Sequence, residues 1–352
     1  MAKLFINIFN LPVKVIEYTR NWNYGVFSEF RNELFGIAIL GVMLAHGLSL
    51  YFSVPIGWLQ KLLTTSSTLV FTQGFLFLSG IGLWFAFNKG VTLKTFYLKR
   101  LFRIFMPWTV IAIPLFFILN ICFDRDIIKF IVSCSTLSFW VSTNNGTWYI
   151  SLTIVLYLIF PILYKLFKKN GLFTFSTINI LYFLFLLTLR YLDEVLFNRL
   201  SIGLSQVPSF FTGIYLGHKV SQGSKPRLWC YLLVFMFFLA FKYLQEYDKI
   251  FAGYYFILQR LISSALLCIP LSFIKTSLLS KILRFCGSIS LELYLSHILL
   301  IPIFKHFNTY YNNFLLSSFP VYHGFTEYLF IISVSFGVSF LYKFGFEKML
   351  KK

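Results

Sequence analysis

The chain has few charged residues, and most of them carry one sign. Only 12% of its 352 residues are charged, about half of the roughly 25% found in soluble globular domains. Asp and Glu number 12 against 31 Lys and Arg, which gives a formal net charge of +19. This number of charges is too small to cover a surface exposed to water. A soluble domain is therefore excluded as the main body of the protein.

Cysteine and metal-binding patterns are also scarce. The five cysteines show no CxxC spacing, and there is no HExxH motif or cluster of carboxylates. We therefore expect neither a disulfide framework nor a metal site, and we interpret the cysteines as small apolar packing residues. Nucleic acid is not an expected partner either, because no soluble basic domain is present to bind it.

Long apolar runs are what the sequence does have. Hydrophobic residues make up 58% of the chain, and Phe alone accounts for 46 positions. Runs of about 20 apolar residues are long enough to cross a bilayer as helices. The pattern predicts an all-α, polytopic membrane bundle whose ten spans lie near 34–52, 64–87, 103–122, 149–167, 172–190, 207–220, 228–244, 251–274, 289–304 and 325–343. The segment 127–141 is shorter and is expected to lie on or dip into the outer surface.

The distribution of Lys and Arg predicts the orientation. Segments on one side of the expected bundle carry more than twice as many of these residues as segments on the other. Because cytoplasmic loops carry the excess of Lys and Arg, both termini are predicted to be cytoplasmic, in the inner membrane. Residues 1–33 are expected to form an amphipathic cytoplasmic segment, 34–345 the membrane domain, and 346–352 a short basic tail. The basic face would meet anionic membrane lipids.

One histidine interrupts the first apolar run, "ELFGIAILGVMLAHGLSLYF" (33–52). His46 lies 12 residues into this span, roughly 18 Å along the helix. Polar groups inside a membrane are costly and usually face a cavity or a partner. His46 is therefore either a structural residue bonded to a neighbouring helix or a general base, since neutral imidazole can accept a proton near pH 7.

Three further polar residues fall inside the expected spans. Arg260 lies in the eighth span, and an ion pair with Glu292 or Glu33 competes with a ligand-binding role. Glu292 and His297 lie five residues apart in the ninth span, so they do not share a face closely. We group Arg260, Glu292 and His297 as a candidate intramembrane polar site.

Two pairs of residues occupy the expected ends of spans. Arg100 and Arg103 share a helix face at i and i+3, and their guanidinium groups would suit phosphates, although simple cytoplasmic anchoring is the alternative. Trp148 and Tyr149 open the fourth span at its outer mouth. Aromatic residues are common at membrane interfaces, but such rings could also stack on a sugar.

Six segments stand in this order along the chain: "GIAILGVMLAH", "GFLFLSGIGL", "YLKRLFRIFMPW", "GTWYISLTIVLYLIFPIL", "FFTGIYLG" and "SISLELYLSH". They resemble motifs of one known family, the integral-membrane acyltransferase 3 family, which includes bacterial O-acetyltransferases of surface polysaccharides. No single motif is specific, but together they run in family order across residues 35–297.

This resemblance implies a reaction and a catalytic residue. The donor would be a cytoplasmic acyl-coenzyme A, acetyl-coenzyme A by default, used as a co-substrate with no tightly bound cofactor. The acceptor would be a hydroxyl of an envelope glycan or lipid-linked sugar at the outer face. His46 aligns with the family's proposed catalytic histidine, which would deprotonate the acceptor or relay the acyl group.

One position departs from the family. A basic residue is usual eleven positions before the histidine, but this chain has Phe35 there. Arg31 is one turn earlier and points about 60° from the His46 direction at 100° per residue. Either the long Arg31 side chain reaches the same groove and binds the donor together with Arg100 and Arg103, or the motif is degraded.

Two other classes of function remain open from the sequence. A multipass transporter or flippase of a glycan precursor would need no site for coenzyme A, and it would more often show two matching halves with broken helices. No such internal symmetry is visible. An inactive paralogue that binds donor or glycan without turnover is the third possibility, because of Phe35.

Overall fold

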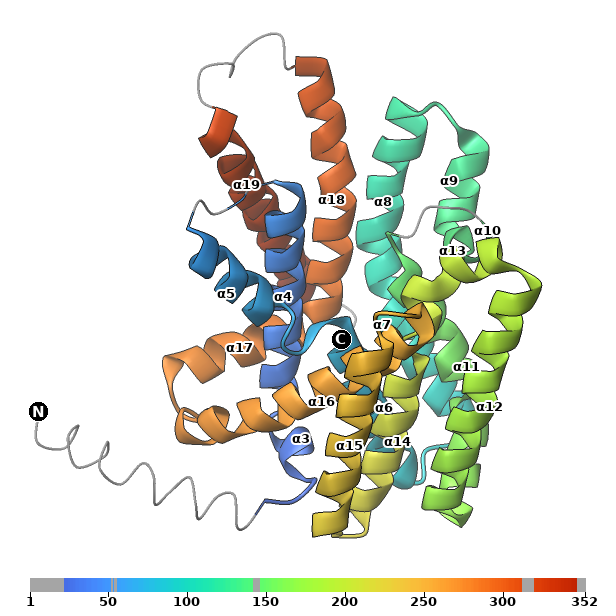
Figure 1. Cartoon of the computed structure of the whole chain (residues 1–352). Coiled ribbons are helices and arrows are strands. Elements are labelled where there is room, and N and C mark those ends of the chain that lie inside the picture. The colour runs from blue at the N-terminus through green and yellow to red at the C-terminus, as the bar shows by residue number, and fades with distance from the viewer. Residues whose placement is uncertain (1–21, 52, 54–55, 142–145, 312–319, 347–352) are drawn as a thin grey trace, which may run out of the picture.

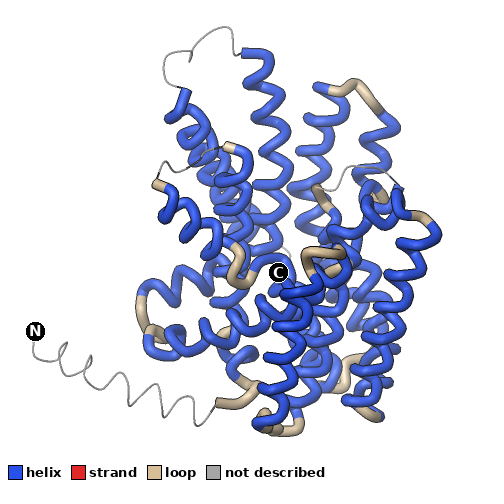
Figure 2. Tube along the Cα trace, viewed as in Figure 1, coloured by secondary structure: helices blue, strands red, loops and turns tan. Residues whose placement is uncertain are grey.

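The computed structural model describes residues 22–51, 53, 56–141, 146–311 and 320–346. These residues form helices joined by short loops, with no strand among them (Figures 1 and 2). The helices are α3 (Val26–Glu29), α4 (Arg31–Leu50), α5 (Gly57–Ser67), α6 (Phe71–Asn88), α7 (Leu93–Pro107), η1 (Trp108–Ala112), α8 (Ile113–Phe116), η2 (Phe117–Phe123), α9 (Ile127–Cys134), α10 (Ser138–Val141), α11 (Trp148–Lys169), α12 (Gly171–Leu192), α13 (Glu194–Leu204), α14 (Val207–Ser221), α15 (Leu228–Leu244), α16 (Lys249–Phe273), α17 (Leu278–Ser288), α18 (Ser290–Tyr311), α19 (Pro320–Leu341) and η3 (Tyr342–Phe346).

The all-α prediction is confirmed, but the count of ten spans is not. Within the described residues, seven helical segments are long and apolar enough to cross a membrane, or eight if the bent pair α17–α18 counts as one span. The expected spans at 207–220 and 228–244 correspond to α14 and α15, which have 15 and 17 residues. Both are shorter than the roughly 20 residues typical of a spanning helix.

Two predicted segments at the ends of the chain are only partly described. Most of the expected amphipathic segment 1–33 and nearly all of the tail 346–352 lie outside the described residues. The expected surface segment 127–141 forms two short helices, α9 and α10.

The third long segment, Leu93–Phe123, is a single 31-residue run made of α7, η1, α8 and η2. Pro107 ends α7, and the π-helical turn η1 follows it directly. Pro114 is the second residue of α8 and follows η1 almost directly, so its missing N–H removes one backbone hydrogen bond from the continuous run. Proline and π-helical turns are the usual causes of irregularity in a long helix, and in this segment η1 lies between the two prolines.

The buried apolar residues form two clusters that meet at α6. One cluster joins α4 and α6 to α18 and α19, and the other joins α6 to α11, α12 and α14. Leu78 and Ile81 belong to the first cluster, whereas Leu76 and Trp84 belong to the second. Helix α6 is therefore buried on opposite faces and lies between the two clusters (Figure 1).

Two glycines let α4 and α17 touch backbone to backbone. A Cβ at Gly36 would lie 2.1 Å from the carbonyl oxygen of Leu283, and one at Gly287 would lie 1.9 Å from that of Asn32. Small residues allow this kind of approach between membrane helices. In Figure 1, α17 crosses the lower part of α4, and α18 then rises beside it after a bend of 69°.

We expect Gly36→Ala to destabilise the protein by about 1–3 kcal/mol, because the new methyl group overpacks a contact made by backbone atoms that cannot rotate away. The measurement is the apparent melting temperature of the purified protein in detergent. Gly337 is the matched control, since it also lies inside a helix but has open space around it. Gly337→Ala should leave the melting temperature unchanged or raise it slightly. Equal effects of the two substitutions would contradict the close approach.

Candidate functional site

A cavity of about 530 Å³ opens where α4, α6, α7, α11, α17 and α18 meet. Its lining residues are Arg31, Asn32, Phe35, Thr72, Phe75, Ser79, Arg100, Arg103, Ile104, Tyr149, Ile150, Thr153, Tyr157, Gly287, Ser288, Ser290, Leu291, Tyr294 and Lys343. The α4–α17 contact forms part of this wall, because Gly287 and Asn32 belong to both. The volume lies in the range of small-molecule and cofactor sites.

The charge of this cavity is of one sign. Four cationic side chains line it, Arg31, Arg100, Arg103 and Lys343, and no Asp or Glu is among its described lining residues. The Arg103 guanidinium donates to the carbonyl oxygen of Ser288 at 3.5 Å, and the Lys343 ammonium contacts the Ser288 hydroxyl. Cations without neighbouring carboxylates keep their donors available for a polyanion, and arginine suits phosphate in particular.

Arg31 reaches the cavity from the first turn of α4. Its Nε donates to the carbonyl oxygen of Leu78 at 3.2 Å, and its guanidinium carbon lies 4.6 Å from the centre of the Phe35 ring. At that distance the ring attracts the cation through its π face. Phe35, at the position where the family usually has a basic residue, therefore supports a basic side chain one turn away, and both residues line the cavity.

His46 and His297 form a hydrogen-bonded pair. His46 Nδ1 and His297 Nε2 are 3.0 Å apart, with their rings stacked at 5.2 Å. His297 is completely buried, and its Nδ1 lies 2.8 Å from the carbonyl oxygen of Leu293. The two residues are 251 positions apart in the sequence, so only the fold brings them together.

The hydrogen bonds of this pair determine which nitrogen carries each proton. The Leu293 carbonyl can only accept, so His297 Nδ1 donates to it. Neutral His297 then has a lone pair on Nε2, which accepts the hydrogen from His46 Nδ1. Neutral His46 is left with its own lone pair on Nε2, the form that can take a proton from a substrate.

Aromatic rings connect the cavity to the histidine pair. Ring centres are separated by 5.6 Å from Phe35 to Phe75, 5.8 Å from Phe75 to Tyr149, and 5.5 Å from Tyr149 to Tyr294. Tyr294 lies 6.1 Å from His297 and donates its hydroxyl to the Gly146 carbonyl oxygen at 2.9 Å. Tyr294 thus lines the cavity on one side and contacts the histidine pair on the other.

The model of the acyltransferase 3 family, an acyltransferase domain, matches residues 36–344. The chain belongs to the acyltransferase 3 family. Comparison with curated proteins and with solved structures gives no match. As a member of this family, the chain is a membrane acyltransferase that transfers groups other than aminoacyl groups. This favours the acyltransferase over the transporter that the sequence had left open. His46, Arg100, Arg103 and His297 lie inside the matched region.

The three residues grouped as an intramembrane polar site do not come together. His297 pairs with His46, whereas Arg260 lines a different, smaller cavity that includes neither Glu292 nor His297. Arg260 forms no ion pair with Glu33 or Glu292. All three lie inside expected spans of the sequence, but that position alone does not determine which helix faces which.

Glu33 has another partner. The Arg284 Nε of α17 donates to its carboxylate at 2.6 Å, and the Ser280 hydroxyl donates to the same oxygen at 3.0 Å. The Glu33 side chain is 4% exposed, so this pair compensates a buried charge beside the α4–α17 contact.

Trp148 and Tyr149, expected together on the acceptor side, also separate. Tyr149 lines the cationic cavity. Trp148 is only 6% exposed and lies, with Phe139, against Gly203 of α13. Packing covers its indole ring, so of the two residues only Tyr149 faces the cavity, and the acceptor-side role of the pair stays a prediction.

Two residues of the site escaped sequence reasoning. Lys343 looks like one more anchoring cation near the end of the last span, and Tyr294 looks like an ordinary aromatic residue of the "SISLELYLSH" motif. A sequence signal existed for Tyr294 alone, because it precedes His297 by three residues and so shares its helix face.

We expect the Glu33–Arg284 pair to couple in a double-mutant cycle measured by apparent melting temperature and denaturant unfolding. Arg284→Gln should cost about 1–3 kcal/mol, since it leaves a buried carboxylate without its charged partner. In a Glu33→Gln background the same change should cost clearly less. Strict additivity of the two changes would show that the pair contributes no coupling.

Proposed function

We propose that the chain transfers an acyl group, acetyl by the family resemblance, from acyl-coenzyme A to a hydroxyl of an envelope glycan or a lipid-linked sugar. The observation that carries this proposal is the adjacency of a carboxylate-free cationic cavity to the His46–His297 pair, with Tyr294 between them. A donor with several phosphates and a thioester needs both: cations for the phosphates and a base near the acyl carbon.

The proposed orientation places the cationic cavity on the cytoplasmic side of the inner membrane, with both termini cytoplasmic. The distribution of Lys and Arg supports this orientation. Arg100, Arg103 and Lys343, which line the cavity, belong to segments on the basic side. His46, 15 residues after Arg31 on α4, lies roughly 22 Å further along the helix axis, toward an acceptor approaching from the outer face.

In the proposed reaction the acceptor hydroxyl attacks the thioester carbonyl while His46 Nε2 takes its proton. The carbon–sulfur bond breaks, the acyl group remains on the acceptor oxygen as an ester, and the coenzyme A thiolate takes a proton from the medium or from His46. His297 is a positioning residue: by accepting from His46 Nδ1 it holds the ring and its lone pair in one orientation. Removing a positioned base typically costs 10²–10⁴-fold in rate.

The histidine pair gives the first test. Membranes receive acetyl-labelled coenzyme A, and label is followed into glycan and lipid-linked sugar at matched protein level. His46→Ala should abolish incorporation. His297→Phe should lower kcat about 10-fold or more with little change in KM, because the base loses its orientation. His297→Gln offers an amide oxygen to His46 Nδ1 and should restore part of the rate.

Three results would count against this assignment. Wild-type rates from His46→Ala would remove it from the chemistry. Equal losses in His297→Phe and His297→Gln, accompanied by a lower melting temperature, would make His297 a packing residue. Absence of label transfer by the wild type would argue against the proposed donor or acceptor.

The cationic lining gives the second test. Arg31→Gln and Arg103→Gln should each raise KM for acyl-coenzyme A about 10-fold while kcat changes little, because each removes one charge-assisted contact to phosphate. The effect should shrink as salt rises. Lys94→Gln is the matched control, since Lys94 is exposed in the same basic region but does not line the cavity. A KM that is unchanged in both arginine variants would place the donor elsewhere.

A further inference from the structure

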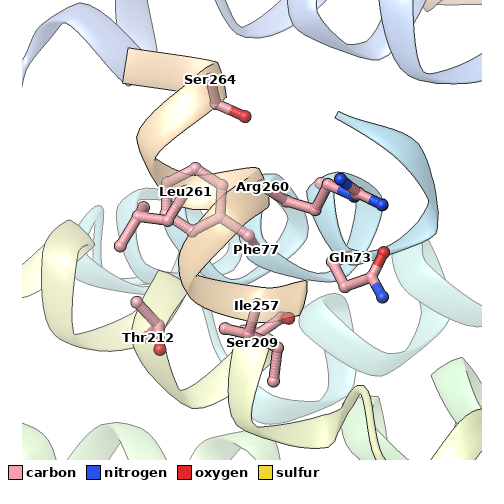
Figure 3. A pocket seen from close by; sticks show the side chains of 9 residues that line it. Gln73, Phe77, Ser209, Thr212, Ile257, Arg260, Leu261 and Ser264 are labelled. Atoms are coloured by element: carbon pink, nitrogen blue, oxygen red, sulfur yellow. The ribbon is translucent and has the colours of Figure 1, made fainter. Parts of the chain in front are cut away.

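A second, small cavity lies between α6, α14 and α16, and it shares no residue with the cationic cavity. Its volume, taken as the space open to the centre of a water molecule, is about 10 Å³. This is room for one small species. Its lining residues are Gln73, Gly74, Phe77, Ser209, Thr212, Ile257, Arg260, Leu261 and Ser264 (Figure 3).

Arg260 brings a positive charge to this cavity. It lies near the middle of the 25-residue helix α16 and is 8% exposed. Its side chain extends from α16 toward Gln73 of α6 (Figure 3). Among the described residues no carboxylate forms an ion pair with it, and its guanidinium carbon lies 5.5 Å from the centre of the Phe256 ring.

Two hydroxyl groups beside Arg260 also lack hydrogen-bond partners in the described part of the chain. Ser209 Oγ and Ser264 Oγ are both buried, with residue exposures of 2% and 1%, and neither forms a hydrogen bond. The Nε of Arg260 is likewise buried and without a partner. Three polar atoms from two helices therefore line one small space with no protein group to satisfy them.

The close packing of α6 and α14 maintains this space. A Cβ at Gly213 would lie 2.1 Å from the carbonyl oxygen of Phe77, and one at Gly80 would lie 2.6 Å from that of Phe210. Because the two backbones are in contact beside the cavity, α6 and α14 cannot approach each other further to close it.

We propose that this cavity binds one small monovalent anion, of which chloride is the natural example. The guanidinium offers only donors and a full positive charge, and the two serine hydroxyls can both donate. A buried cation needs a counter-charge in a low-dielectric interior. A water molecule would satisfy hydrogen bonds but would leave that charge uncompensated, and a dianion such as sulfate carries more charge than the single guanidinium offsets.

Chloride titration of the purified protein in detergent tests this proposal independently of any acyl transfer. Starting in sodium gluconate, gluconate is exchanged for chloride at constant ionic strength. The apparent melting temperature should rise with the logarithm of chloride concentration above the dissociation constant. Bromide should replace chloride, and sulfate should not. Radioactive chloride should be retained at a single ion per chain.

Variants separate a specific site from general screening. Arg260→Met should remove the chloride response. Ser264→Ala keeps the charge but loses one donor, so it should need several-fold more chloride for half the effect. Lys242→Gln, which removes an exposed cation on α15, should retain the full wild-type response.

Two outcomes would overturn the proposal: equal melting temperatures of the wild type in chloride and gluconate, or an Arg260→Met variant that responds like the wild type. If Arg260→Met does not fold, Ser209→Ala and Ser264→Ala decide instead. An unchanged half-effect concentration in both would overturn the proposal equally.

Discussion

The backbone contact between α4 and α17, at Gly36 and Gly287, is the constraint on which the rest of the site depends. Helix α4 carries Arg31 near its beginning and His46 near its end, whereas α17 leads through a bend of 69° into α18, which carries His297. With larger side chains at the glycines, the helices would move apart, and both the cavity wall and the histidine pair would open. The absence of a side chain at Gly36 and Gly287 thus determines the geometry of two histidines that each lie ten residues further along the chain.

Helix α18 also separates two chemical environments. A polyanion requires a cavity with unpaired cations, whereas a base works best where its ring has one orientation and little water competes for it. Tyr294 lines the cationic cavity, and His297, one turn further along the same helix, is completely buried. Under the proposed function, phosphates would be held on one side of the Tyr294 ring and the acyl carbon would pass to the other. The ring is fixed by its hydroxyl bond to the Gly146 carbonyl, so the passage would require that bond to be exchanged.

Composition and hydropathy were sufficient for the all-helical class, for most of the long spans and, through ordered motifs, for the family. They gave less information on helix length and on which residues become partners. Helices α14 and α15 are apolar enough to look like spans but have only 15 and 17 residues, because hydropathy reports composition rather than helix ends. The pairing of His46 with His297 could not be predicted, since periodicity shows which face a residue occupies but not which helix meets it. Lys343 was missed for the same reason, because a cation near the end of the last span looks like an anchor until the fold places it beside Phe285 and Ser288 of α17.

The two kinds of buried polar group in this bundle show that composition predicts the free-energy cost of burying a polar side chain, but not which partner offsets that cost. Histidine can be neutral, so His46 and His297 are satisfied by a chain of hydrogen bonds that ends at the Leu293 carbonyl and needs no counter-charge. Arginine remains charged in proteins, and hydrogen bonds alone do not offset its desolvation. Glu33 meets the same requirement by pairing with Arg284. Arg260 is the buried ion for which the described chain supplies no such partner, so the physics that explains Glu33 also points to a charge from outside the protein.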